Sequence, residues 1–184
     1  MGIFSKNKEK STPNFSMNDH IQYELNNNSN IETDRKVFAN VRFPYENMLE
    51  TIPLIMSCKK GIFIFITLPT IGEYIGGKFE SLWVLGNERI TNPIETQKNK
   101  SLALSSYLKI PKNKIIPYIV LNNNSIIRDI PYCTKDYRIV RERDLYYFLG
   151  LHTSILPDQI KEEELQKIKT KLDKSNILKE LYND

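Results

Sequence analysis

The amino-acid sequence predicts an α/β protein with a mixed central sheet flanked by helices. Two apolar runs, Gly61–Leu68 and Ile115–Leu121, have the length and the β-branched and aromatic content of buried central strands. Between them, Asn92 and Pro93 form a favourable helix start, with Asn as N-cap and Pro at the first helical position. A chain of 184 residues has the length of one compact domain with modest extensions.

The first third of the chain predicts a tail, a helix and three strands. Residues 1–16 are polar and contain several lysines, and we expect them to form a flexible polar tail. Ser16 is a suitable N-cap for a short helix that ends at three consecutive asparagines. Alternating apolar residues at 37–43 predict a strand. The apolar runs at 52–57 and 61–68 are separated by three residues, which is typical of an antiparallel hairpin.

The remaining elements are short, apart from a C-terminal amphipathic helix. A glycine-rich turn region at 71–78 is followed by predicted strands near 82–85 and 137–140, and by a short helix at 144–149. The last helix is expected to begin at Pro157, with an apolar stripe formed by Leu165, Ile168 and Leu172. We therefore expect an α/β domain over residues 17–150 and a C-terminal helical extension over residues 151–184.

Composition limits the functional classes. The formal charge of +4 and a pI near 8.9 permit contact with nucleic acid without requiring it, because the lysines are spread along the chain. The abundance of Asn, Ile and Lys suggests an AT-rich genome, which raises the lysine content for reasons unrelated to binding. No segment has the length and apolarity of a membrane span or a secretory signal, so we expect a cytoplasmic protein.

Cysteine and histidine usage does not suggest a metal centre. Cys58 and Cys133 have no Cys or His neighbour at metal-binding spacing, and His20 and His152 are isolated in the sequence. Two free thiols in a reducing compartment are the expected state of the cysteines. The sequence therefore predicts neither a metal site nor a cofactor.

The order of elements resembles one known family. The segment Lys60-Gly61-Ile62-Phe63, the glycines at 72, 76 and 77 with Trp83, the Asn92-Pro93 helix start and the core strand at 115–121 follow at consistent distances. From Val37 to about Leu149 this order is similar to the nuclease-related domain (NERD) family. The resemblance implies a restriction-endonuclease-like core of the PD-(D/E)XK type. It also implies an activity in which an Asp, a Glu and a Lys act with Mg²⁺ on DNA phosphodiesters.

The chemistry departs from the family pattern. With Gly61 as the alignment point, the family Asp, Glu and Lys fall on Pro53, Ile66 and Leu68. None of these side chains can bind Mg²⁺, which requires oxygen ligands, or polarise water. The expectation is a degenerate nuclease, or pseudoenzyme, rather than an active enzyme. The cleft should be hydrophobic and free of metal.

An active enzyme with moved ligands is the alternative. Glu50, Glu73 and Lys78 are the charged residues from which a relocated Mg²⁺-dependent site can be built, and Glu80 is a further nearby carboxylate. Glu50 lies three residues before Pro53, an odd offset that places it on the other face of an unbroken strand. Surface charges flanking a buried hairpin are the simpler interpretation of these residues.

A non-catalytic module needs a partner, and the sequence offers two classes. Gln97, Lys98 and Lys100 lie on the helix that follows Asn92 and can contact DNA phosphates, or they form an ordinary exposed face. The lysines at positions 109, 112 and 114 slightly favour nucleic acid. Alternatively, the C-terminal helix docks a protein partner or a second copy. Its apolar stripe can instead pack on its own domain, and we prefer that interpretation.

Overall fold

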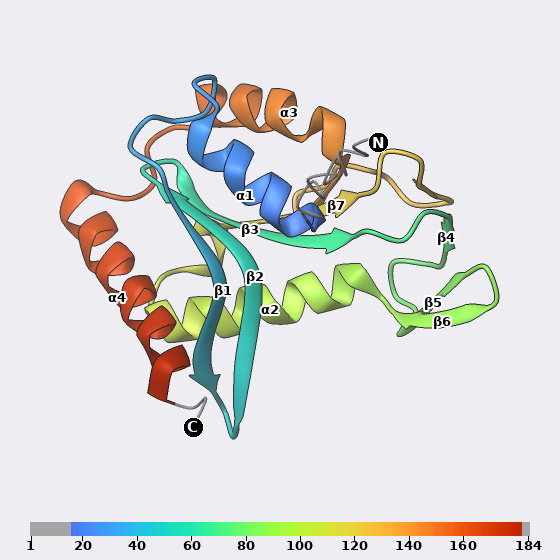
Figure 1. Cartoon of the computed structure of the whole chain (residues 1–184), viewed down its shortest axis with the longest axis horizontal. Helices are drawn as coiled ribbons and strands as arrows, with labels where there is room; N and C mark the ends of the chain where they lie inside the picture. The colour runs from blue at the N-terminus through green and yellow to red at the C-terminus, as the bar shows by residue number, and fades with distance from the viewer. Residues whose placement is uncertain (1–15, 182–184) are drawn as a thin grey trace, which may run out of the picture.

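The computed structural model describes residues 16–181, so the expected tail lies outside the described residues except for Ser16. A five-stranded sheet in the order β1-β2-β3-β7-β9 forms the centre (Figure 1). The first three strands are an antiparallel meander, whereas β3, β7 and β9 run parallel to one another. The strands are β1 (Lys36–Tyr45), β2 (Met48–Cys58), β3 (Gly61–Leu68), β7 (Ile115–Leu121) and β9 (Arg138–Arg141).

Four helices cover the two faces of this sheet. In Figure 1, α1 and α3 lie on one face and α2 and α4 on the other. Their bounds are α1 (Met17–Asn27), α2 (Pro93–Leu108), α3 (Glu142–Ile155) and α4 (Glu162–Leu181), with a short 3₁₀ turn, η1 (Lys112–Lys114), before β7. The predicted fold class, a mixed sheet flanked by helices with a C-terminal helix, is confirmed, and it is consistent with a restriction-endonuclease-like core.

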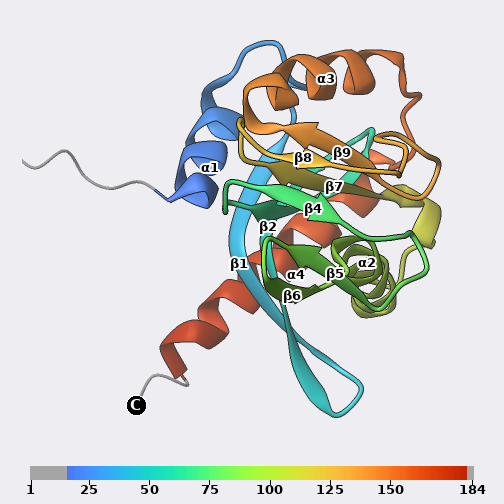
Figure 2. The ribbon, with the colours of Figure 1, turned by 90° about the vertical axis from the view of Figure 1, so that its right-hand side faces the viewer.

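A second, four-stranded sheet lies beyond the carboxyl end of β3 (Figures 1 and 2). Its order is β6 (Glu88–Thr91), β5 (Leu82–Leu85), β4 (Glu73–Ile75) and β8 (Ile126–Ile127). Trp83 and Tyr74 are fully buried and form a third core with Ile66 and Ile94. Sequence analysis predicted only the strand that contains Trp83, because its partners have two to four residues each.

Local chemistry explains where the helices start and end. Ser16 caps α1 reciprocally: its hydroxyl accepts from the Asp19 amide, and the Asp19 carboxylate accepts from the Ser16 amide. At the other end, the Arg35 guanidinium donates to five carbonyl oxygens, at Leu25, Asn26, Asn28, Ile31 and Glu32. Asn92 caps α2 as predicted, with Pro93 at the first helical position.

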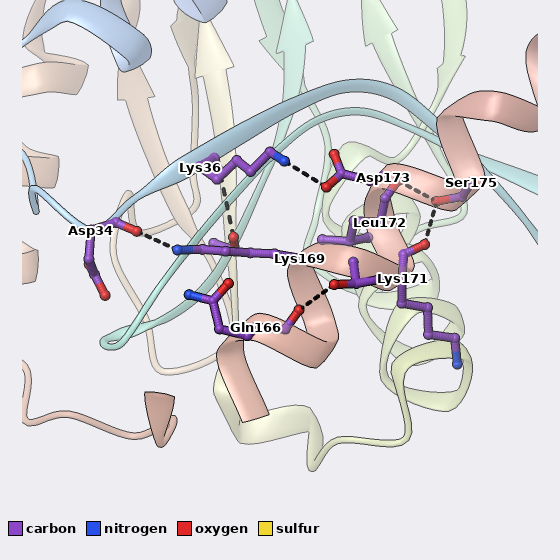
Figure 3. Close-up of polar contacts among 10 residues, drawn as sticks. Asp34, Lys36, Gln166, Lys169, Lys171, Leu172, Asp173 and Ser175 are labelled. Carbon is purple, nitrogen blue, oxygen red and sulfur yellow. Dashed lines mark hydrogen bonds and ion pairs between the residues drawn. The ribbon is translucent and has the colours of Figure 1, made fainter. Parts of the chain in front are cut away.

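The α4 helix is part of the main core. Leu165, Ile168 and Leu172 are buried against the β1 side of the sheet, so the apolar stripe packs on its own domain. Figure 3 shows polar contacts that flank this stripe: Lys36 Nζ lies 2.6 Å from a carboxylate oxygen of Asp173, and Lys169 donates to the Asp34 carbonyl. Side chains beyond Ser175 lie outside the described part of α4.

Two predicted helix bounds were wrong. The last helix begins at Glu162, because the amides of Gln159 and Ile160 instead donate to the Lys59 carbonyl in the β2–β3 turn. The helix expected at 144–149 extends from Glu142 to Ile155. The boundary expected between residues 150 and 151 therefore lies inside α3.

The β2 strand changes faces at Pro53. Ile52 and Ile55 are three residues apart, yet both lie in the core against α2, whereas Leu54 lies in the core against α1 and α3. The register skips the pair formed by Pro53 and Asn40, and Asn40 has a positive φ of 50°. Strict alternation does not hold across this point, so the odd-offset argument for Glu50 fails.

Candidate functional site

Pro53, Ile66 and Leu68, which we expect at the positions of the family's catalytic residues, lie on the adjacent strands β2 and β3. The last residue pair of the β2–β3 ladder is Leu54 with Phe65, and Pro53 and Ile66 are the residues next to that pair. Ile66 is 8% exposed and belongs to the core that contains Trp83, and Leu68 packs against the same core. Pro53 is half-buried. The side chains at these positions are therefore apolar, and none offers an oxygen ligand.

Glu50 and Lys100 form an ion pair between β2 and α2. Lys100 Nζ, from α2, is 2.6 Å from Glu50 Oε1 and donates to the Thr51 carbonyl at 2.6 Å. The same Glu50 oxygen accepts from the Thr51 amide at 2.9 Å. Both side chains are mostly buried, at 17% and 24% exposure. Glu50 therefore faces α2, and the Lys100 ammonium is bound to protein oxygens.

Gln97 holds two strands of the sheet. Its Nε2 donates to the carbonyl oxygens of Ile64 in β3 and Tyr118 in β7, at 3.1 and 2.5 Å. The side chain is fully buried, and its Oε1 has no hydrogen-bond partner among the described residues. The Gln97 side chain therefore points into the sheet, away from solvent.

Lys98 is the exposed member of the predicted phosphate-binding set. Lys98 and Lys100 are two residues apart, so their side chains leave α2 about 200° apart. Lys98 lines a groove of about 370 Å³, which we call the Lys98 groove. The groove is also lined by Lys78, Phe79, Glu95, Lys112, Asp136 and Tyr137, so its three lysines exceed its two carboxylates by one charge.

The Lys98 groove combines positive charge with an exposed aromatic ring. Phe79 is 94% exposed, and Lys78 Nζ lies 5.6 Å from its ring centroid. Lys78 is also 3.2 Å from Asp136, whereas Lys98 and Lys112 form no ion pair with a described carboxylate. Phe79 was not predicted as a binding residue. Its position after Gly76-Gly77-Lys78, in a turn that exposes the ring, is the sequence feature that could have indicated an exposed aromatic side chain.

The proposed relocated ligands do not converge. Glu73, in β4, pairs with Arg128, while Glu50 pairs with Lys100 and Lys78 with Asp136. Among the side chains that the structure describes, no three of the His, Cys, Asp or Glu type are grouped so that they could hold a metal ion. Each of these charges is therefore neutralised by a different partner.

The cysteines and histidines also occupy separate environments. Cys58 is buried in β2 and Cys133 is exposed, and neither forms a disulfide. Burial raises the pKa of the Cys58 thiol to about 12, so it is protonated at neutral pH. His20 Nδ1 lies 2.7 Å from Glu142, whereas His152 contacts the Tyr118 hydroxyl.

The mixed five-stranded sheet and the helices on its two faces define an α/β protein, and they are consistent with a restriction-endonuclease-like core. A family model of the nuclease-related domain matches residues 17–122, and the chain belongs to this family. Comparisons with curated proteins and with solved structures each give no match. The matched range runs from α1 through β7, so β9, α3 and α4 complete the fold beyond it. In the described part of the chain, no helix is long and apolar enough to cross a membrane.

Proposed function

We propose that this chain is a non-catalytic nuclease-related domain that binds DNA by its phosphates along the Lys98 groove. The apolar side chains of Pro53, Ile66 and Leu68 support the first part of this proposal, the lack of catalysis. Hydrolysis of a phosphodiester by this fold needs oxygen ligands for Mg²⁺ at these positions. Apolar side chains there leave the metal without ligands and the attacking water without a polarising group.

The charge and shape of the Lys98 groove support the second part of this proposal, the binding of DNA. Lys98 and Lys112 project into one groove without a described carboxylate partner, so their charge is available to an incoming phosphate. The exposed Phe79 ring adds a surface on which a base can stack. Gln97 and Lys100 are bound to other protein groups, so Lys98 is the predicted contact that the proposal retains.

The binding test is the dependence of DNA affinity on salt concentration. The affinity should fall as salt rises, and Lys98→Ala and Lys112→Ala should each make the log–log slope shallower by about 0.9. Arg143→Ala is the matched control, because Arg143 is exposed on α3, on the other face of the sheet. Undetectable binding at low salt would reject the DNA proposal and favour a protein partner. Such a partner must use a surface other than the buried stripe of α4.

One observation favours the second candidate, an active Mg²⁺-dependent nuclease. The carboxylate of Glu50 and the ammonium of Lys100 are the two group types that such a site uses, and Glu50 lies three residues before Pro53 in β2. Purified protein should nevertheless leave DNA intact in Mg²⁺ or Mn²⁺. Metal-dependent cleavage that Glu50→Gln or Glu73→Gln abolishes would establish the active enzyme. Cleavage that survives both changes would indicate a contaminating nuclease.

A further inference from the structure

A second concave site lies between α3 and the edge strand β9, on the sheet face away from the Lys98 groove. Its volume is about 540 Å³, within the range of small-molecule pockets. We call it the α3 pocket. Its apolar lining includes Ile139, Val140, Phe148, Leu151 and Ile155.

The α3 helix has apolar side chains on two sides, and only one side is buried against the sheet. Leu145 and Leu149 face the sheet and are fully buried. Phe148, Leu151 and Ile155 form a second stripe and remain 47%, 49% and 70% exposed. This second stripe forms one side of the α3 pocket, so an apolar ligand there would cover side chains that the described chain leaves in water.

The hydroxyls of the two lining tyrosines already have hydrogen-bond partners within the protein, one of which is the lining residue His152. The Tyr118 hydroxyl lies 2.8 Å from His152 Nδ1. The Tyr132 hydroxyl accepts from the Ile127 amide at 3.0 Å and donates to the Ile127 carbonyl at 3.3 Å. Neither hydroxyl is left to recognise the polar edge of a nucleobase. The pocket is therefore better matched to an apolar ligand body than to a nucleotide.

Two guanidinium groups provide charge at the β9 side. Arg138 and Arg141 line the pocket, and neither forms an ion pair with a described carboxylate. Arg141 Nε is buried without a hydrogen-bond partner among the described residues. Asp144 also lines the pocket and lies 3.7 Å from Arg143. The two lining arginines therefore exceed the lining carboxylate by one positive charge.

We propose that the α3 pocket binds a small amphipathic anion, a free medium-chain fatty carboxylate whose acyl chain lies on the α3 stripe and whose acid group meets Arg138 and Arg141. The planar guanidinium fork matches the geometry of a carboxylate. The acyl chain needs no hydrogen-bonding partners, which agrees with the engaged tyrosine hydroxyls. This site is independent of DNA binding and of nuclease chemistry.

Calorimetric titration of the full chain with monomeric decanoate tests the proposal, with decanol as the uncharged ligand. Decanoate should bind saturably and at least about tenfold more tightly than decanol. Arg141→Gln, and Arg138→Gln combined with it, should remove most of that preference, whereas Asp144→Asn should retain or strengthen decanoate binding. Leu151→Asp should abolish binding, while Leu49→Asp, at an exposed leucine on β2, should not.

Several results would overturn the assignment. These are equal affinity for decanol and decanoate, an unchanged affinity in folded Arg141→Gln protein, or no saturable decanoate binding. Association with phosphatidylglycerol vesicles without binding of monomeric decanoate would assign the surface to a membrane instead. Capture of an acidic helical peptide in place of decanoate would assign it to a protein partner. Urea unfolding of each variant confirms that a lost signal reflects the pocket and not the fold.

Discussion

Acidification should destabilise the protein through His152. The imidazole is 9% exposed, its Nδ1 lies 2.8 Å from the Tyr118 hydroxyl, and the Phe63 ring packs edge-on against it. Burial, and then the positive charge of Arg138, lower the pKa of His152 from 6.5 to about 4. Between these two pH values the unfolded chain binds a proton that the folded chain does not.

The sign and size of the change in the free energy of unfolding follow from this difference in proton binding. The contribution of His152 to the free energy of unfolding is complete above pH 6.5 and is lost as the pH falls from 6.5 through about 4. At about 1.4 kcal/mol for each tenfold change, the full loss is roughly 3 kcal/mol, of which about 2 kcal/mol has occurred by about pH 5.

Urea unfolding at about pH 7, 6 and 5 measures this loss. The carboxylates titrate alike in wild type and in His152→Gln, so the difference between the two proteins isolates the histidine. That difference should change by about 2 kcal/mol across the range, because glutamine accepts from Tyr118 but does not titrate. Parallel pH profiles for wild type and His152→Gln would refute the reasoning.

Four substitutions test the fold, each by urea unfolding. Arg35→Lys should cost about 2 kcal/mol or more, since one ammonium cannot replace a guanidinium that donates to five carbonyls at the end of α1. Gly76→Ala should cost about 1–3 kcal/mol, because a Cβ there meets the indole of a fully buried tryptophan. Leu172→Ala should cost about 2–5 kcal/mol by leaving a cavity under α4. Lys36→Ala should cost less than about 1 kcal/mol, because both partners of its ion pair are half exposed. A large loss in Lys36→Ala, or a negligible one in Leu172→Ala, would contradict the assigned packing.

Long apolar runs and clear caps made most of the main sheet predictable. The strands at 61–68 and 115–121 and the helix starting after Asn92 appear at those positions, because burial on both faces and side-chain capping are local signals. The second sheet was largely missed. Glu73–Ile75 and Ile126–Ile127 pair only because the chain brings them together, and runs of two or three residues carry no period.

The candidate site was harder to predict than the main sheet, because it also depends on contacts between distant segments. The sequence shows which residues are apolar, but the partners of charged side chains depend on tertiary structure. The face change at Pro53 turns Glu50 toward α2. The rule that successive side chains of a strand point to opposite faces cannot predict such a change, because it assumes an unbroken strand. A glutamine on a helix can be either exposed or buried, so the sequence alone did not predict that Gln97 links β3 and β7. That role depends on how α2 packs on the sheet.

That link has a consequence for the order of folding. The three strands of the meander are neighbours in sequence, so their pairing closes short loops and should form early. The parallel seam between β3 and β7 must wait until the chain at 69–114 has crossed back over the sheet. Gln97 lies within that crossover and bonds to both strands of the seam. Docking of α2 and closure of the seam should therefore be a single late event in the folding reaction.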